Sequence, residues 1–355
     1  MAFQVSPGVQ VKEIDLTNVV PAVSTSIGGF VGAFAWGPAE EIRTVSSEKE
    51  LVNVFGSPND TTAKSFFTAA SFLKYATALK VVRVVPDGTG GSTTAKNATS
   101  GSGGNSGLLI KNYQAYEDNY IGGSANVGAW GARCPGVLGN SLRVEVCSSS
   151  AAFSSWAYAG EFDKTPGTSD FAAKYGSSND EIHIVVLDED GLISGTKNTV
   201  LEKFGFVSQA SDALKADGTS NYYKNVINGN SSYIFWLDLF DAVDGQGAIL
   251  SNSGEAASAA VAFDTESTIV TFSLTGGTDG STVGTSQLST GIDIFADAET
   301  VDVNLLFSTN DANGTNTIAE KLISVAAARK DIVVFLSPPT EDTVGTSVPA
   351  ADVKT

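Results

Sequence analysis

The residue types that most often carry out chemistry are scarce in this chain. Its one histidine, His183, lies between Ile182 and Ile184 in an alternating stretch typical of a β-strand. This position favours a strand residue that faces solvent or a polar neighbour over a general base. Serine catalysis would also have to use His183, and no Gly-x-Ser-x-Gly turn precedes a helix. Cys134 and Cys147 are too few for a disulfide framework, so we expect two buried free thiols.

Candidate metal and phosphate sites fail on their spacing. The run Asp188-Glu189-Asp190-Gly191 lacks the ligand spacing and terminal glutamate of a calcium loop, so it predicts a hairpin turn. No group of His, Cys and acidic residues has the spacing of zinc ligands. The glycines of 88–107 and 276–280 lack the basic residue of a phosphate loop, since Lys96 is followed by Asn97. We therefore predict no catalytic residue, no cofactor and no metal ion, and expect that the protein is not an enzyme.

Composition and charge limit the partners. The 355 residues are enough for two domains. Acidic residues outnumber basic ones by 39 to 21, and the basic ones are scattered, so we expect neither nucleic acid nor an anionic membrane surface as a partner. The net charge of −18 opposes self-association, so any assembly must rely on short-range contacts. No signal peptide and no apolar run of about 20 residues is visible.

Hydrophobic patterns predict an α/β fold of mixed α+β character: a central mixed sheet flanked by helices, with β-hairpins and a Gly/Ser-rich insertion. Strands are predicted at 30–36, 81–85, 142–146, 181–187, 233–237 and 267–274, and helices at 47–56, from Asp60 to Leu73, at 208–216 and at 220–228. A strand at 301–306, a helix at 317–329 and a strand at 331–336 follow. This last spacing predicts a parallel strand pair with a right-handed crossover.

We predict the following segments along the chain. Residues 1–20 form an extended arm, and 21–86 with 133–340 form a discontinuous α/β core, with two subdomains divided near 290 as an alternative. Residues 87–132 are a Gly/Ser-rich insertion or a reduced protruding domain, and 341–355 are a connector. The Gly-rich stretch 88–107 has almost nothing apolar to bury, so we expect a mobile surface excursion or the neck of an insertion.

Several segments, taken in order, resemble the tail sheath proteins of contractile-tailed bacteriophages, the myoviruses. They are Ser6-Pro7-Gly8-Val9 with Glu13, the stretch from Ile27 to Pro38, Phe55-Gly56-x-Pro58, Val81 to Val85, Pro135 to Leu142, Val200 to Phe204, Asn221 to Tyr223 with Tyr233-Ile234, Leu274 to Gly280, and Arg329 to Pro339. Each block is common by itself. Their order over most of the chain is specific.

The resemblance implies a structural function in the virion tail. Sheath subunits stack as hexameric rings around a tail tube, and a baseplate signal releases a contraction that drives the tube through the host envelope. The implied partners are other sheath subunits, the tail tube protein and the baseplate, with assembly in the host cytoplasm. Val9, Val11 and Ile14 are the candidates for subunit contact, as a strand donated to a neighbour's sheet. The alternative is an arm folded on its own domain.

Two departures from the sheath pattern bear on these expectations. Only residues 86–132 separate Val85 from Arg133, so a protruding domain at this place is expected to be small or missing. Family members continue past the strand before Pro338-Pro339, whereas this chain stops at Thr355, so we expect a fragment without the C-terminal domain or a short member. Two alternatives stay open: another virion protein, of the baseplate or capsid-decorating kind, and an α/β nucleotide-binding module.

Overall fold

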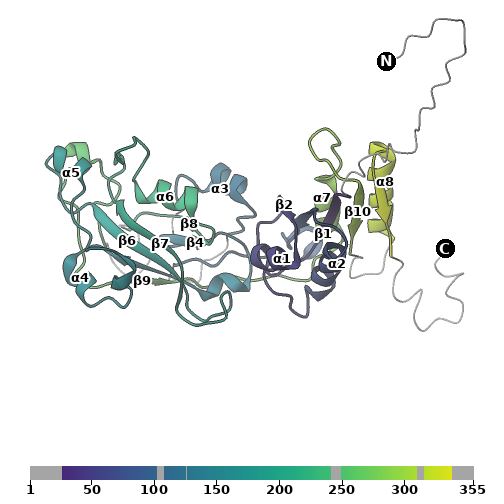
Figure 1. Ribbon diagram of the computed structural model, residues 1–355, viewed down its shortest axis with the longest axis horizontal. Helices are drawn as coiled ribbons and strands as arrows, with labels where there is room; N and C mark the ends of the chain where they lie inside the picture. Colours follow the sequence, from purple (N-terminus) through teal and green to yellow (C-terminus); the bar gives the residue numbers. More distant parts are fainter. Residues whose placement is uncertain (1–25, 102–107, 125, 241–248, 310–315, 338–355) are drawn as a thin grey trace, which may run out of the picture.

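The computed structural model describes residues 26–101, 108–124, 126–240, 249–309 and 316–337. They form an elongated molecule of two lobes (Figure 1). The first lobe contains both the beginning and the end of the described chain, and the middle of the chain forms the second lobe. None of the helices in the described ranges combines the length and hydrophobicity of a transmembrane span.

The first lobe is built on a five-stranded sheet with strand order β11-β10-β1-β3-β2. Its strands are β1 (Gly28–Gly32), β2 (Ile42–Val45), β3 (Leu79–Arg83), β10 (Leu305–Ser308) and β11 (Val333–Phe335). The pairs β1–β3, β1–β10 and β10–β11 are parallel, whereas β2 runs antiparallel to β3 at one edge. The two ends of the described chain therefore share one sheet.

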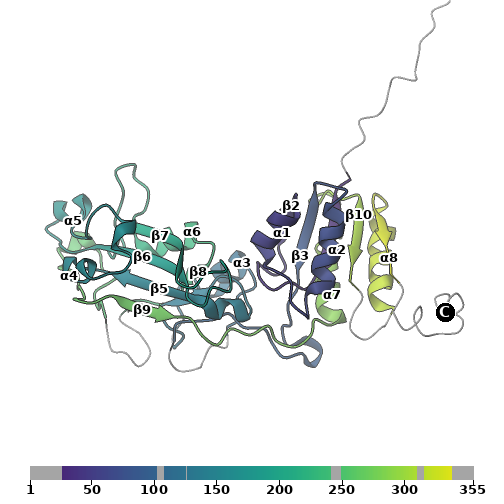
Figure 2. The same cartoon turned by 60° about the horizontal axis from the view of Figure 1, so that its bottom comes forward.

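Helices cover both faces of this sheet (Figure 2). They are α1 (Glu48–Phe55) and α2 (Ala63–Leu73) on one face, and α7 (Thr285–Asp293) and α8 (Thr317–Arg329) on the other. Because side chains alternate along a strand, Phe30 packs with α1 and α2, whereas Val31 packs with α7 and α8. Gly28 lets α2 approach β1 closely, since a Cβ there would lie 2.6 Å from the ring of Phe72.

The second lobe contains two antiparallel sheets, of strand order β7-β6-β5-β9 and β4-β8. Its strands are β4 (Trp130–Ala132), β5 (Leu142–Cys147), β6 (Glu181–Asp188), β7 (Thr199–Ser208), β8 (Ile234–Trp236) and β9 (Val270–Ser273). Its α-helices are α3 (Tyr113–Asn119), α4 (Ser150–Ser154), α5 (Asp170–Lys174) and α6 (Tyr223–Asn230). Four 3-10 turns are described as well: η1 (Thr89–Gly91), η2 (Val137–Ser141), η3 (Ala159–Glu161) and η5 (Ala257–Ala259).

The core of the second lobe extends to the first. Trp130, Val144, Ile184 and Tyr223 belong to one cluster of buried side chains between the two sheets and α6. Trp36, which follows β1 in the first lobe, belongs to the same cluster and is 6% exposed. The lobes therefore share buried apolar surface, which favours a fixed arrangement.

The mixed α/β fold class is confirmed. The last predicted unit is confirmed in its order: α8 spans the predicted residues, and β10 and β11 on either side of it are parallel. Its first strand, expected at 301–306, lies at 305–308. Ser47 caps α1 as its sequence predicts, because its hydroxyl accepts a hydrogen bond from the backbone N–H of Glu50.

Other predicted elements differ more clearly from the structure. The strand expected at 30–36 ends at Gly32, because the apolar residues that follow it are buried at the lobe junction and not in the sheet. The helix expected from Asp60 begins at Ala63, after a turn that the side chain of Asn59 organises. Residues 208–216 are not helical: β7 continues to Ser208, and a turn follows.

The sheets divide the chain differently from the predicted segments. The predicted core joined 21–86 to all of 133–340, but the sheet of the first lobe takes only 28–83 and 305–335. Strands β5, β6, β7 and β9 form a separate sheet in the second lobe. Strand β4, which lies within the predicted insertion 87–132, pairs there with β8. Local patterns do not carry this division, because sheet membership depends on long-range pairing. The arm at 1–20 and the connector at 341–355 lie outside the described residues.

Candidate functional site: the junction between the lobes

The predicted contact residues are not part of the described structure. Val9, Val11 and Ile14 lie outside the described residues, so their role as a donated strand stays a prediction. The described residues do include His183, both cysteines, the acidic run 188–191 and most of the glycine-rich segments. They also include a polar junction between the lobes.

His183 is a buried structural residue, and of the two predicted surroundings, solvent or a polar neighbour, the structure shows polar neighbours. It is 0% exposed, and its ring stacks on Phe162 at 4.3 Å between centroids. The N–H of Phe206 donates to Nδ1, so Nε2 carries the proton and donates to the carbonyl of Lys164. Burial lowers the pKa of His183, against the effect of these backbone contacts. Both ring nitrogens are thus occupied by the protein itself.

The two cysteines fit the prediction of free, buried thiols. Cys134 and Cys147 are both buried and unpaired. Burial raises the pKa of each thiol to about 11, so both are protonated and unreactive at neutral pH.

The acidic run after β6 organises a turn. Asp188 is buried and accepts hydrogen bonds from the hydroxyl of Ser141 and from the backbone and hydroxyl of Ser194. These bonds outweigh the effect of burial and lower the pKa of Asp188. The carboxylate oxygens are therefore used for loop hydrogen bonds. In the part of the chain that the structure describes, no group of three His, Cys, Asp or Glu residues is placed to hold a metal ion.

The two glycine-rich segments lie side by side and form a neck between the lobes. The chain leaves the first lobe through 86–101 and returns through 274–284 (Figure 2). Lys96 and Thr278 exchange backbone hydrogen bonds of 2.9 and 3.1 Å, and Thr99 and Thr275 exchange bonds of 2.9 and 2.8 Å. The prediction of a neck fits this pairing, but Asn97 and Thr99 are buried, so this part of 88–107 is not a surface excursion.

Arg83, at the end of β3, connects the lobes from inside. Its guanidinium donates to the carbonyls of Phe34 (2.9 Å) and Gly37 (2.6 Å) in the first lobe and Pro135 (2.8 Å) in the second. The side chain is 2% exposed and belongs to none of the ion pairs among the described residues. Burial lowers the pKa of Arg83 to about 10, partly offset by charges that include Asp279. The group stays charged at neutral pH, with the peptide dipoles of both lobes around it.

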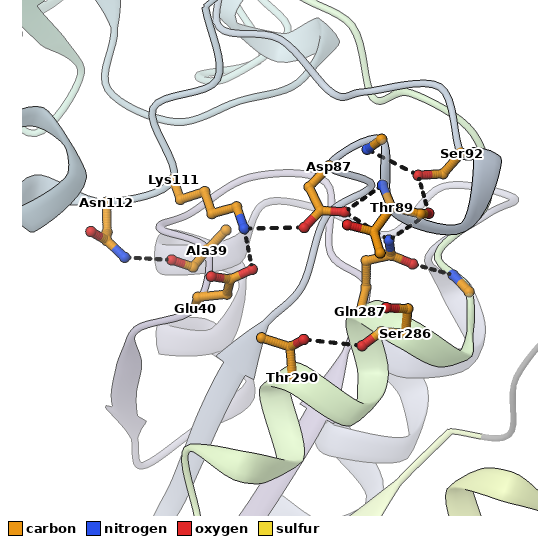
Figure 3. A network of polar contacts seen from close by, with 12 residues as sticks. Ala39, Glu40, Asp87, Thr89, Ser92, Lys111, Asn112, Ser286, Gln287 and Thr290 are labelled. Carbon is orange, nitrogen blue, oxygen red and sulfur yellow. Dashed lines mark hydrogen bonds and ion pairs between the residues drawn. The ribbon is translucent and has the colours of Figure 1, made fainter. Parts of the chain in front are cut away.

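A second polar contact at the junction is a network around Lys111 and Asp87 (Figure 3). Lys111, just before α3, pairs with Glu40 at 2.6 Å and with Asp87 at 3.3 Å. Asp87 also accepts a hydrogen bond from Gln287 of α7. Burial would raise the pKa of Asp87, but this bond, those from Thr89 and the charge of Lys111 hold it well below its usual value. The pKa of Lys111 is raised, because its two carboxylate partners outweigh desolvation.

Backbone contacts next to this network continue it. The N–H of Ala39 donates to the carbonyl of Lys111 (2.7 Å), and the amide of Asn112 donates to the carbonyl of Ala39 (2.9 Å). The residues of the junction come from six separate stretches of the chain, so motif searches miss them. One signal was available: Arg83 is a charged residue within the β-branched run Val81 to Val85, where an unpaired charge is costly.

A cavity of about 960 Å³ opens where β1, β3 and β10 end at their carboxyl side. Ligands of open α/β sheets bind at this place, so the cavity is the position to test for a nucleotide site. Its basic lining residues are Lys64, Arg83 and Lys96, and α2 begins beside it. The side chain of Asn59 already accepts from the backbone N–H groups of Thr61 and Thr62. The backbone N–H groups before a helix usually bind a phosphate, but here Asn59 already accepts hydrogen bonds from two of them. This arrangement disfavours a phosphate at the start of α2.

Comparison with known proteins finds tail sheath proteins of bacteriophages. Residues 25–84, which include β1 to β3, match the family described as "Tail sheath protein Gp18 domain III N-terminal region". The chain is 27% identical to the tail sheath protein of Enterobacteria phage T4 in an alignment that covers 98% of this chain and 63% of that protein. It is 48% identical over 94 residues to the tail sheath protein of Vibrio phage KVP40, covering 26% of this chain and 13% of that protein. The chain is thus similar to tail sheath proteins of several phages. The resemblance in the sequence blocks is thereby confirmed.

Other sheath proteins extend the comparison. The tail sheath protein of Salmonella phage ViI is 34% identical over 201 residues, which cover 56% of this chain and 28% of that protein. The crystal structure of the sheath tail protein Lin1278 from Listeria innocua has a TM-score of 0.46 and 12% identity, covering 90% of this chain and 49% of that one. The chain spans less than two thirds of the length of each of these sheath proteins.

Proposed function

We propose that this protein is a structural subunit of the tail sheath of a bacteriophage. The observation that carries the proposal is the alignment with the tail sheath protein of phage T4 over 98% of this chain. The subunit polymerises around the tail tube, takes its place in the virion tail after assembly in the host cytoplasm, and contracts to drive the tube through the host envelope. Its partners are other sheath subunits, the tail tube protein and the baseplate. The proposed role is mechanical and not enzymatic.

The arm is proposed to supply one of the subunit contacts. Val9, Val11 and Ile14 would add a strand to the sheet of a neighbouring subunit. The outer strand β11 supports this idea, because it is the last strand of the sheet and exposes Val333 by 58% and Phe335 by 56%. Large apolar side chains at an open sheet edge favour pairing with another chain.

Electron microscopy of the complete gene product, with and without purified tail tubes, tests the proposal. We expect rings or tubes of regular diameter that become longer in the presence of tail tubes. A gene product that forms neither would contradict the sheath function and favour another virion role, in a baseplate or as a capsid decoration. Saturable binding of a fluorescent nucleotide to the 960 Å³ cavity would favour the nucleotide-binding alternative.

A further inference from the structure

A second cleft lies between the lobes, and its lining is unusual for such an acidic chain. It has a volume of about 400 Å³. Its lining includes Glu41 and Arg43 in the first lobe, Asn53 of α1, and Tyr113, Arg133 and Tyr233 in the second lobe. Arg43 lies on β2, the edge strand opposite β11. We call this space the Arg43–Arg133 cleft.

Arg133 is held in place by aromatic rings and carbonyls. Its guanidinium carbon lies 5.3 Å from the ring centre of Tyr113 and 4.6 Å from that of Phe235. Nη1 donates to the backbone carbonyls of Asn228 and Ser231. No carboxylate of the described residues forms an ion pair with Arg133. The positive charge is therefore positioned by neutral groups.

The neighbouring carboxylates neutralise the cleft only in part. Glu202 accepts bonds from the hydroxyl of Ser231 and the N–H of Ser232, and Glu41 pairs with Arg43 at 2.8 Å. The lining thus has two guanidinium groups against one carboxylate. Burial lowers the pKa of Arg133; the negative charge of Glu202 opposes this effect, and the positive charge of Arg43 adds to it, so the two cations repel each other. An anion between them would relieve that repulsion.

We propose that the Arg43–Arg133 cleft binds an Asp or Glu side chain of a second copy of this chain, a contact that rests on the proposed assembly of copies. Guanidinium groups match carboxylates in geometry and form strong charge-assisted hydrogen bonds with them. The net charge of −18 makes copies repel one another while each carries many carboxylates. A cleft with excess positive charge gives two such copies a complementary contact and fixes their orientation.

Sedimentation velocity over a range of concentrations at low salt tests this proposal. Wild type is expected to associate with increasing concentration. Arg43→Glu should weaken the association roughly tenfold or more, and Arg43→Gln should weaken it less. The matched control is Lys197→Glu, which makes the same charge change at a side chain 71% exposed in the second lobe. Wild type that stays monomeric, or equal weakening by Arg43→Glu and Lys197→Glu, overturns the proposal.

Competition separates a carboxylate contact from general charge effects. Sodium glutamate should weaken wild-type association more than sodium chloride of equal ionic strength, because glutamate competes for the cleft. Equal effects of the two salts overturn the carboxylate assignment. Microscopy separates this proposal from the sheath function. If wild type forms tubes and Arg43→Glu forms them equally well, the cleft contact fails while the sheath function stands. If wild type forms none, the sheath function fails.

Discussion

Arg83 of β3 donates a hydrogen bond of 2.8 Å to the carbonyl of Pro135 in the second lobe. The same guanidinium binds two carbonyls of its own lobe. One buried side chain therefore satisfies polar backbone groups on both sides of the junction, and its removal leaves carbonyls in both lobes without a donor.

Replacing Arg83 should destabilise both lobes together. Arg83→Met leaves three buried carbonyls unpaired, each costing about 1–3 kcal/mol, and relieves part of the cost of burying a charge, so we expect a net loss of about 3 kcal/mol. Urea denaturation followed by tryptophan fluorescence measures the loss. The control Arg43→Met makes the same substitution at a side chain 48% exposed and should cost less than about 1 kcal/mol. Similar losses in the two variants would show that Arg83 does not connect the lobes.

The junction around Asp87 should make stability depend on acid pH. Its folded pKa is lowered, so its contribution is complete above the unfolded pKa of about 4 and is lost as pH falls toward the folded value. Asp87→Asn should therefore lower the melting temperature at pH 7 and flatten its decrease below pH 4. Thermal denaturation from pH 7 to pH 2 measures both effects. In a double-mutant cycle, Lys111→Met should reduce the effect of Asp87→Asn, and simple additivity would contradict the ion pair.

His183 should stay neutral in the folded protein well below its usual pKa. Since burial lowers the folded pKa, the unfolded chain takes up a proton first, and stability should fall as pH drops below about 6.5. His183→Gln should remove this part of the pH dependence. The chain has one histidine, so its ring signals in a ¹⁵N NMR spectrum need no assignment. They should show protonated Nε2 and unprotonated Nδ1, and titration with a pKa near 6.5 would contradict the buried geometry.

The neck requires glycine at Gly280. Its φ is +72°, and a Cβ there would lie 2.3 Å from the carbonyl oxygen of Thr93 on the outgoing segment. Gly218 has a similar φ of +83° with nothing within 4 Å, so Gly218→Ala measures the backbone penalty alone, about 1–2 kcal/mol. Gly280→Ala should cost about 2 kcal/mol more, because the neck must also separate. Equal free energies of unfolding would show that the close approach is not important.

Local patterns predicted the units of this fold that rely on neighbouring residues. The unit β10–α8–β11 combines an apolar strand, an Ala-rich helix and a second strand within 305–335, so periodicity and crossover rules were sufficient to predict its order and the parallel pairing. The assignment of strands to sheets was not predictable in this way. Strand β1 pairs with β10, which lies 277 residues further along the chain at Gly28 and Leu305, and no local pattern carries that information.

The junction was hidden for a related reason. Lys111 and Asp87 are ordinary surface residues by sequence, and only the fold brings them together across the neck. His183 was predicted as a structural strand residue that faces solvent or a polar neighbour, and the sequence did not decide between the two. An alternating strand does not reveal that another segment, here the one with Phe162, covers its outer face.

Because of the paired neck, the second lobe is an insertion whose two ends lie next to each other. Thr93 and Ser281 are 188 residues apart in sequence, yet the N–H of Thr93 donates to the hydroxyl of Ser281 at 3.0 Å. A polypeptide that enters and leaves a lobe at the same point can lose that lobe, or exchange it for another, without moving the strands it departs from. We therefore expect the five-stranded sheet to vary less among related proteins than the lobe that the neck carries. The same two positions are the natural place to graft a foreign domain onto this protein.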